Sequence, residues 1–305
     1  MLNAAMIPTK LPPIKQKQLK VTIGIFAHNE EKNVNATIDS IEKQVLNLTI
    51  IEEIIVVSSG SNDKTNELVV KKSQSNPKIK LYTQAERQGK SAAINLFLSH
   101  AKSPIVVTVS ADLRLHKKAI EEILVPFLQP DVGMVGAHPV PTNSARTSMG
   151  KVVHLLWELH HEISLVKPKC GEMVAFRNII RQIPPQSAVD EATLEVLLQL
   201  IGYSTVYAPR SIVYNSGPKT VADFIMQRRR VFAGHQWVNH QYNYRVATLN
   251  LPLIATIIAR HIMRSPTSLS SLLSLIILEI SSRLMGWIDY NLMGKNPYVW
   301  QMVKR

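Results

Sequence analysis

The stretch Val106-Val107-Thr108-Val109-Ser110-Ala111-Asp112 decides the fold. Its β-branched residues predict a buried strand, and the chain then changes to a helix-forming run from His116 to Leu128. A strand that ends on a carboxylate at the edge of an open α/β sheet lies where ligands bind. Asp112 is therefore a candidate for holding a metal-bound phosphate. The alternative is that Asp112 only caps the turn that follows it.

Other strand candidates precede this one, and each is followed by a helix candidate. The strands are predicted over Val21–Ala27, Glu53–Val57 and Lys78–Thr83, and the helices over Asn33–Gln44, from about Thr65, and over Ala92–His100. This alternation predicts an α/β fold with a mainly parallel, doubly wound sheet and helices on both faces. The loops that follow the strands then meet at one edge of the sheet.

Composition limits the classes of partner. With 305 residues, 46% of them hydrophobic, the chain can bury a sizeable core. A net charge of +13 predicts an anionic partner, which nucleic acid, nucleotide phosphates and a membrane surface would all satisfy. The single cysteine, Cys170, excludes an internal disulfide and is interpreted as a packed thiol. Residues 1–20 read as a flexible arm without a cleaved signal peptide.

The second half of the chain carries charged groups on predicted helices. A metal site among His154, His160 and His161 is disfavoured because metal ligands usually come in a tight set with carboxylates or cysteines, so this helix is expected to face the active site or a membrane. Asp190 and Glu191 begin another helix. Three consecutive arginines, Arg228–Arg230, fan around a third helix, so at least one should point inward and need an anion.

Residues 241–305 are predicted to form apolar helices. Leu251–Met263 is too short to span a bilayer, whereas Thr267–Met293 is long enough but contains Glu279 and Arg283, one turn apart and able to pair. Charges at the centre of a bilayer are costly. We therefore expect interfacial or hairpin-like membrane attachment rather than a simple span, with a soluble helical appendage as the alternative.

Taken in order, these motifs resemble the family 2 inverting glycosyltransferases with the nucleotide-diphospho-sugar transferase (GT-A) fold. The resemblance runs from about Val21 to Trp237 and rests on Phe26-Ala27-His28-Asn29-Glu30-Glu31, Ser58-Ser59-Gly60-Ser61-Asn62-Asp63-Lys64-Thr65, Gly89-Lys90 with Ala93 and Asn95, Ser110-Ala111-Asp112, Asp190-Glu191 and Gln227-Arg228-Arg229-Arg230-Val231. Four positions depart from the family pattern. Ser59 and Ser110 replace aspartates, Glu191 stands where aspartate is usual, and Val231 replaces tryptophan. The last departure weakens the case for a processive polysaccharide synthase.

The resemblance implies a set of roles. Asp112 would hold Mg²⁺ or Mn²⁺, and Glu191, with Asp190 in reserve, would be the general base. The leaving diphosphate would be contacted by Gln227, Arg229 and Arg230. The donor would be bound by Asn29, Glu30, Ser59, Asp63, Gly89, Lys90 and Ala111. The implied domain covers residues 21–240.

The resemblance also implies a reaction. A nucleotide-diphospho-sugar, with a UDP-sugar favoured over a GDP-sugar, would give its sugar with inversion to a hydroxyl acceptor on a lipid-linked or envelope glycan. The basic surface and apolar tail suggest a membrane-associated protein with its catalytic domain in the cytoplasm. The alternative is a non-catalytic relative that binds nucleotide sugar as a subunit. Nucleic acid is not expected as a partner, because aromatic residues are not interleaved with the basic ones.

Overall fold

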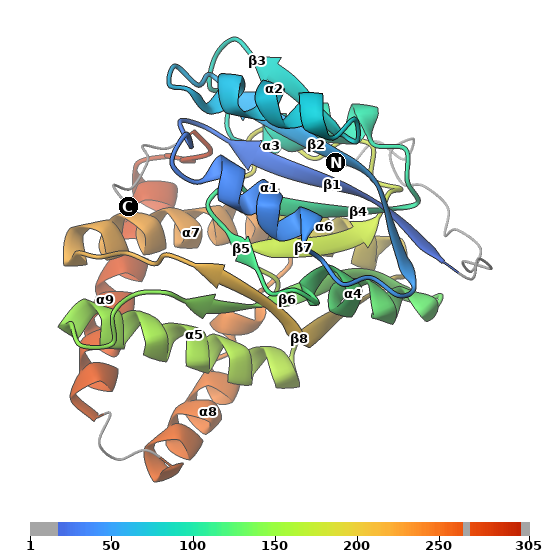
Figure 1. The fold of residues 1–305 in the computed structure, drawn as a ribbon. Helices are drawn as coiled ribbons and strands as arrows, with labels where there is room; N and C mark the ends of the chain where they lie inside the picture. The colour runs from blue at the N-terminus through green and yellow to red at the C-terminus, as the bar shows by residue number, and fades with distance from the viewer. Residues whose placement is uncertain (1–17, 265–268, 300–305) are drawn as a thin grey trace.

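A computed structural model describes residues 18–264 and 269–299 (Figure 1). Most of the predicted N-terminal arm, residues 1–17, lies outside the described residues. The arm was predicted two residues too long, because Leu19 already belongs to the first strand and is buried.

The elements alternate as the sequence predicted through the first half of the chain. The strands are β1 Leu19–Ala27, β2 Thr49–Ser59, β3 Ile79–Gln84, β4 Ile105–Ser110, β5 Arg114–Leu115, β6 Val132–Pro141, β7 Met173–Arg177 and β8 Ser204–Asn215. The α-helices are α1 Val34–Glu42, α2 Thr65–Ser75, α3 Lys90–His100, α4 Ala119–Leu124, α5 Ser148–Val166, α6 Asp190–Leu200, α7 Val221–Tyr242, α8 Leu251–Arg264 and α9 Leu269–Trp287. Short 3₁₀ turns cover Val125–Leu128 and Ala247–Leu249, and α9 continues into a π-helical turn, Ile288–Leu292.

These strands form one eight-stranded sheet in the order β3-β2-β1-β4-β7-β6-β8-β5. Strands β1 to β4 pair in parallel, and β6 pairs in parallel with β8. Strand β7 is antiparallel to both β4 and β6, and the short β5 is antiparallel to β8. The mainly parallel sheet is thus confirmed, and its parallel strands end at a common edge.

The two faces of the sheet are covered by different helices, as predicted. Neighbouring side chains of a strand point to opposite faces. Val107 accordingly packs in a core with residues of α1 and α4, whereas Val106 packs in a second core with residues of α3 and α6. Both valines are fully buried, so the β-branched run of β4 is the central layer between two cores.

Two predicted boundaries in the middle of the chain were wrong. The predicted helix from His116 to Leu128 is shortened, because β5 precedes α4 and a 3₁₀ turn with Pro126 follows it. The loop predicted from His138 to Thr147 begins later, because β6 continues to Pro141. In this extension β6 pairs with β8 and not with β7, so proline, which has no N–H to donate, can be accommodated toward the unpaired side.

Helices α8 and α9 form a pair beside α5 and α7 at one end of the molecule (Figure 1). The predicted pairing of Glu279 and Arg283 is confirmed, with Arg283 Nε donating to Glu279 Oε2 at 2.9 Å. Within residues 18–264 and 269–299, Leu269–Leu292 is the single helix that passes a length and composition test for a membrane span. Its carboxylates, however, reach across to α7, as described below.

The central position of β4 predicts that truncating its buried side chains lowers the free energy of unfolding. Val107→Ala should lower the free energy of unfolding by about 2 kcal/mol, because it removes two buried methyl groups and leaves a cavity. Val70→Ala is the matched control, since Val70 of α2 is 45% exposed. Urea denaturation followed by circular dichroism measures both variants, and equal destabilisation would contradict the assigned core.

Candidate active site

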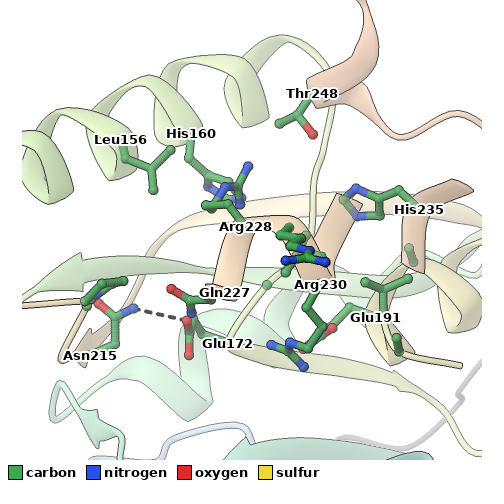
Figure 2. A pocket seen from close by; sticks show the side chains of 18 of the residues that line it. Leu156, His160, Glu172, Glu191, Asn215, Gln227, Arg228, Arg230, His235 and Thr248 are labelled. Carbon is green, nitrogen blue, oxygen red and sulfur yellow. Dashed lines mark hydrogen bonds between the residues drawn. The ribbon is translucent and has the colours of Figure 1, made fainter. Parts of the chain in front are cut away.

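A large cavity lies where the first helix turns of α3 and α6 meet the ends of β1 and β4. Its volume is about 1140 Å³, and side chains of α5, α7, α8 and α9 complete its walls. The cavity therefore joins the predicted catalytic domain to the C-terminal helices. Figure 2 shows part of its lining.

Most of the predicted site residues line this one cavity. They are Glu30, Ser59, Gly89, Lys90, Ala111, Asp112, Asp190, Glu191, Gln227, Arg229 and Arg230. They come from segments far apart in the chain, and the parallel topology brings them to the same edge of the sheet.

Asn29 and Asp63 are not among the lining residues and instead connect the loops after β1 and β2. Asn29 Oδ1 accepts a hydrogen bond from the amide of Asn62 at 2.9 Å, and Asp63 Oδ2 accepts one from the amide of Glu31 at 3.0 Å. Burial raises the pKa of Asp63, but hydrogen bonds from Thr65 and Glu31 outweigh burial and hold it below its ordinary value. The loops that carry Glu30 and Ser59 are thus held together by these two side chains.

Lys90 forms ion pairs with both carboxylates that were predicted as candidates for the general base. Its ammonium nitrogen lies 2.9 Å from Asp190 Oδ2 and 2.9 Å from Glu191 Oε1. Lys90 begins α3, and both carboxylates begin α6, so the ion group links the first turns of two helices. The adjacent Ser91 hydroxyl donates to the carbonyl of Ser187 at 2.7 Å, which holds the loop before α6 on α3.

The ion group formed by Lys90, Asp190 and Glu191 shifts the pKa values of the two carboxyls in opposite directions. Burial and the neighbouring Glu191 raise the pKa of Asp190 above its ordinary value. Burial also opposes ionisation of Glu191, but the Lys90 ammonium outweighs burial and lowers its pKa. Because interacting carboxyls titrate as a pair, the first proton taken up on acidification goes to Asp190.

The three consecutive arginines of α7 have different surroundings. Arg228 donates to Glu279, and its Nη2 lies 3.2 Å from Glu279 Oε2. Arg229 forms an ion pair with Asp289 of the π-helical turn. Arg230 points toward Glu191 in Figure 2; burial lowers its pKa to about 10, while Glu191, Asp190 and Glu172 favour its charged form. The expectation that one arginine points inward to an anion is confirmed.

Gly89 has a steric as well as a conformational reason to be glycine. Its φ is +92°, and a Cβ placed there would lie 2.8 Å from the carbonyl oxygen of Tyr298. Pro297 lines the cavity, and the Asn296 amide donates to the carbonyl of Gln186 at 2.7 Å. The segment after the π-helical turn therefore lies directly against the start of α3.

Sequence reasoning missed Glu172 and Asn215 as site residues. The Asn215 amide donates to Glu172 Oε1 at 3.1 Å, and both side chains line the cavity (Figure 2). Glu172 has a φ of +62°, a conformation that costs a non-glycine residue about 1–2 kcal/mol. Burial and the charge of Glu191 raise its pKa. No sequence signal marks a left-handed glutamate, so only the structure could place it here.

The three histidines of α5 have different surroundings. His154 Nε2 contacts the carbonyl of Asn143 at 2.8 Å, and His161 Nδ1 contacts the Tyr207 hydroxyl at 2.7 Å, whereas His160 lines the cavity. The expectation that this helix faces the site is confirmed for His160. Cys170 is buried and its pKa is raised well above the ordinary value by burial, as expected of a packed thiol.

Two groups of side chains offer oxygen or nitrogen ligands to a cation. Ser110, Asp112 and Asn215 all line the cavity, and each carries an oxygen donor of the kind that Mg²⁺ and Mn²⁺ prefer. A second group, Glu158, Glu162 and His261, has ligand atoms within 4.8 Å of one another between α5 and α8. None of these last three lines the cavity.

Family models match this chain over two overlapping ranges. Glycosyl transferase family 2 matches residues 22–184, and glycosyl transferase family group 2 matches residues 105–293. The chain belongs to glycosyl transferase family 2. The matched ranges contain Asp112, Glu191 and Arg230, so the family assignment covers the elements that form the cavity.

Curated relatives in this family act on different molecules. A dolichyl-phosphate β-glucosyltransferase of Trichomonas vaginalis is 31% identical over 65% of this chain and 63% of its own length. A poly-β-1,6-N-acetyl-D-glucosamine synthase of Staphylococcus aureus is 24% identical over 80% of this chain and 62% of its own. The chain thus spans about three fifths of the length of these two relatives.

A solved structure confirms the fold. A mannosyltransferase from Pyrobaculum calidifontis, in complex with GDP-Man and Mn²⁺, superposes with a TM-score of 0.65 and 20% identity. The match covers 94% of this chain and 91% of that one, so it includes the C-terminal helices. The family 2 glycosyltransferase has a GT-A fold, as the sequence resemblance implied.

The Lys90 ion group generates a prediction about stability and pH. Lys90→Met leaves two buried carboxylates without their cation, so their pKa values in the folded state should rise above those in the unfolded chain. A group with a raised folded pKa loses stability as the pH rises through that pKa. The variant should therefore be about 3 kcal/mol less stable than the wild type at pH 8 and closer to it at pH 5.

Denaturant unfolding at pH 5, 6, 7 and 8 measures this difference. Lys72→Met is the matched control, because Lys72 pairs with two carboxylates, Asp39 and Glu42, at the surface. Its effect should be within about 1 kcal/mol at every pH. A deficit of Lys90→Met that is the same at pH 5 and pH 8 would contradict the assigned ion group.

Proposed function

We propose that this family 2 glycosyltransferase transfers a sugar, with inversion, from a nucleotide-diphospho-sugar to an acceptor hydroxyl. The observation that carries the proposal is that Asp112, Glu191 and Arg230 line one cavity although they follow a strand, begin a helix and lie within another helix. A metal ligand, a base and a cation for a leaving group are the three components that this reaction needs.

The donor would lie at the ends of β1, β2 and β4. Glu30, Ser59, Gly89, Lys90 and Ala111 line this part of the cavity, and Ser59 Oγ is buried without a hydrogen-bond partner in the described part of the chain. A buried hydroxyl of this kind favours a ligand that supplies its partner. Asn29 and Asp63 contribute by holding the two loops in place. We favour a UDP-sugar, with a GDP-sugar as the alternative.

Asp112 would hold Mg²⁺ or Mn²⁺ together with the donor diphosphate. The ion, when bound, supplies positive charge that neutralises the departing diphosphate. Arg230 faces the same region and would add a second cation, with Gln227 beside it. Arg229 is engaged by Asp289, so its contribution would require that ion pair to exchange for the diphosphate.

Glu191 would act as the general base. The acceptor oxygen attacks the anomeric carbon as the bond to the diphosphate breaks, the nucleoside diphosphate leaves with the electron pair, and the carboxylate takes the acceptor proton. Its lowered pKa keeps Glu191 ionised at neutral pH. Asp190, whose pKa is raised, is the reserve candidate.

The ion pair with Lys90 is also the observation that favours a second function. Lys90 contacts both carboxylates, and serines stand at positions 59 and 110 where the family has aspartates. A relative with its base held in an ion pair could bind nucleotide sugar as a non-catalytic subunit. Nucleotide-sugar binding without turnover would favour that alternative.

A donor screen tests the transfer reaction. Purified protein with Mn²⁺ and a panel of UDP- and GDP-sugars should release nucleoside diphosphate when the acceptor is present in a membrane extract. Glu191→Gln should lower kcat by about 10²–10⁴ and leave donor affinity nearly unchanged, because it removes the base but keeps the shape. Glu67→Gln is the matched control, since Glu67 is an exposed carboxylate in the first turn of α2. Equal turnover by Glu191→Gln would remove Glu191 from the mechanism.

We further propose that α8 and α9 attach the protein to a membrane surface, with the catalytic domain on the cytoplasmic side. The outer face of these helices exposes large apolar side chains at Leu251, Met263, Leu269, Leu273, Ile277 and Leu284. The carboxylates of Glu279 and Asp289 are paired with arginines of α7, which supports a helix lying along the protein rather than one crossing the bilayer alone.

Vesicle flotation tests the membrane proposal. The wild type should float with vesicles of bacterial phospholipids, whereas a Leu273→Glu, Ile277→Glu double variant should remain largely in the soluble fraction, because both side chains are more than half exposed on one face of α9. Val70→Glu on α2 is the control for an added surface charge. Flotation of the double variant like the wild type would contradict this assignment.

A further inference from the structure

The cavity has an apolar half that a nucleotide sugar would not fill. Its walls are aliphatic side chains of α5, α8 and α9, and its polar end opens into the region of Glu191 and Arg230. Six of these aliphatic residues are Leu156, Ile254, Ile258, Leu272, Leu275 and Ile276. A polar sugar or nucleotide placed here would leave its hydroxyls without hydrogen bonds, which is costly.

The inner end of this apolar half carries nitrogen donors. His160 of α5 is 9% exposed, and neither of its ring nitrogens has a hydrogen-bond partner among the described residues. In Figure 2 its ring lies next to Arg228, at the border between the apolar and polar parts. Lys169 lines the same place, and its ammonium approaches only to 3.4 Å of the carbonyl oxygen of Cys170. A buried imidazole facing a cavity in this way indicates a ligand that completes its hydrogen bonds.

The cationic side chains of Lys169, Arg228 and Arg283 line the cavity near this end. Burial, then Lys169 and Arg228, lower the pKa of His160 well below its ordinary value. The pKa of His235 is lowered in the same way, by burial and by Lys169, Arg228 and Arg283. Burial and Arg228 also lower the pKa of Lys169, although Glu191 and Glu195 oppose this. Two arginines, Arg228 and Arg283, share the single carboxylate of Glu279, so their positive charge is only partly compensated.

We propose that this part of the cavity binds a lipid with a phosphate head. The hydrocarbon tail of the lipid lies between α5, α8 and α9, and its phosphate accepts hydrogen bonds from His160, Lys169 and Arg228. That this lipid carries the acceptor hydroxyl, on a glycan joined to its phosphate, rests on the proposed function; that the lipid binds here does not.

A lipid fits this site better than a free phosphate or a soluble glycan. Each buried CH₂ group of the chain contributes about 0.8 kcal/mol, so the aliphatic walls would supply affinity that inorganic phosphate cannot obtain. The same two helices that form these walls, α8 and α9, expose apolar side chains on their outer face. A lipid could therefore pass from a membrane surface into the cavity without its chain being exposed to water.

The experiment compares three probes on the full-length protein in a neutral detergent. Farnesyl phosphate carries chain and head, farnesol carries the chain alone, and inorganic phosphate carries the head alone. Native mass spectrometry and isothermal titration should show tight binding of farnesyl phosphate, at least about tenfold weaker binding of farnesol, and no saturable binding of phosphate. Equal affinities for farnesyl phosphate and farnesol, or for farnesyl phosphate and phosphate, would overturn the proposal.

Matched variants separate the chain site from the head site. Ile276→Trp fills the apolar half and should weaken farnesyl phosphate and farnesol alike by at least about tenfold. The neighbouring Ile277 is 55% exposed on the outer face, so Ile277→Trp should bind both probes as the wild type does. Lys169→Met should weaken farnesyl phosphate about tenfold and leave farnesol unchanged.

The folding of each variant is first checked by the midpoint of its thermal unfolding. If Ile276→Trp does not fold, Ile254→Phe is used in its place to fill the apolar half. The assigned site would be refuted if the cavity-filling variant, or Lys169→Met, bound farnesyl phosphate as tightly as the wild type does. Donor affinity is measured in parallel with UDP- and GDP-sugars. Lipid binding without sugar transfer would count against the proposed function alone, whereas sugar transfer without lipid binding would refute the lipid site alone.

Discussion

The ion group of Lys90 with Asp190 and Glu191 is the interaction on which the site depends. It joins the first turn of α3, which connects the parallel strands β3 and β4, to the first turn of α6, which follows the antiparallel strand β7. Separated, the three charges would each be costly to bury. Held together, they place a carboxylate of lowered pKa in the same cavity as Asp112.

The same requirement for compensated charge attaches the C-terminal helices. Arg228 and Arg229 would leave two cations on the side of α7 if α9 were absent, and Glu279 and Asp289 compensate them. The appendage is therefore part of the cavity rather than a separate anchor. Residues of both helices line the cavity, and their outer side chains include exposed large apolar residues.

Much of the fold could be predicted because its signals are local. Runs of β-branched residues marked β1, β2 and β4, and the alternation with helices predicted the parallel sheet and both cores. The errors lie where neighbours in space decide. The extension of β6 through Pro141 depends on β8, some seventy residues later, because β8 supplies its only pairing there. The direction of β7 could not be predicted, because strand direction has no local signal.

The sequence by itself determined most of the residues that line the cavity, because side chains at strand ends and helix starts of an alternating α/β chain meet at one edge of the sheet. Only the tertiary structure decided how those residues are engaged: Lys90 with two carboxylates, Arg229 with Asp289, and Glu172 in a left-handed conformation beside Asn215. The apolar half of the cavity also appears only in three dimensions, as do the His160 ring nitrogens, which lack a hydrogen-bond partner among residues 18–264 and 269–299. The physical reason is that periodicity and propensity act over a few residues, whereas ion pairs and cavities form between side chains that the chain brings together from far apart.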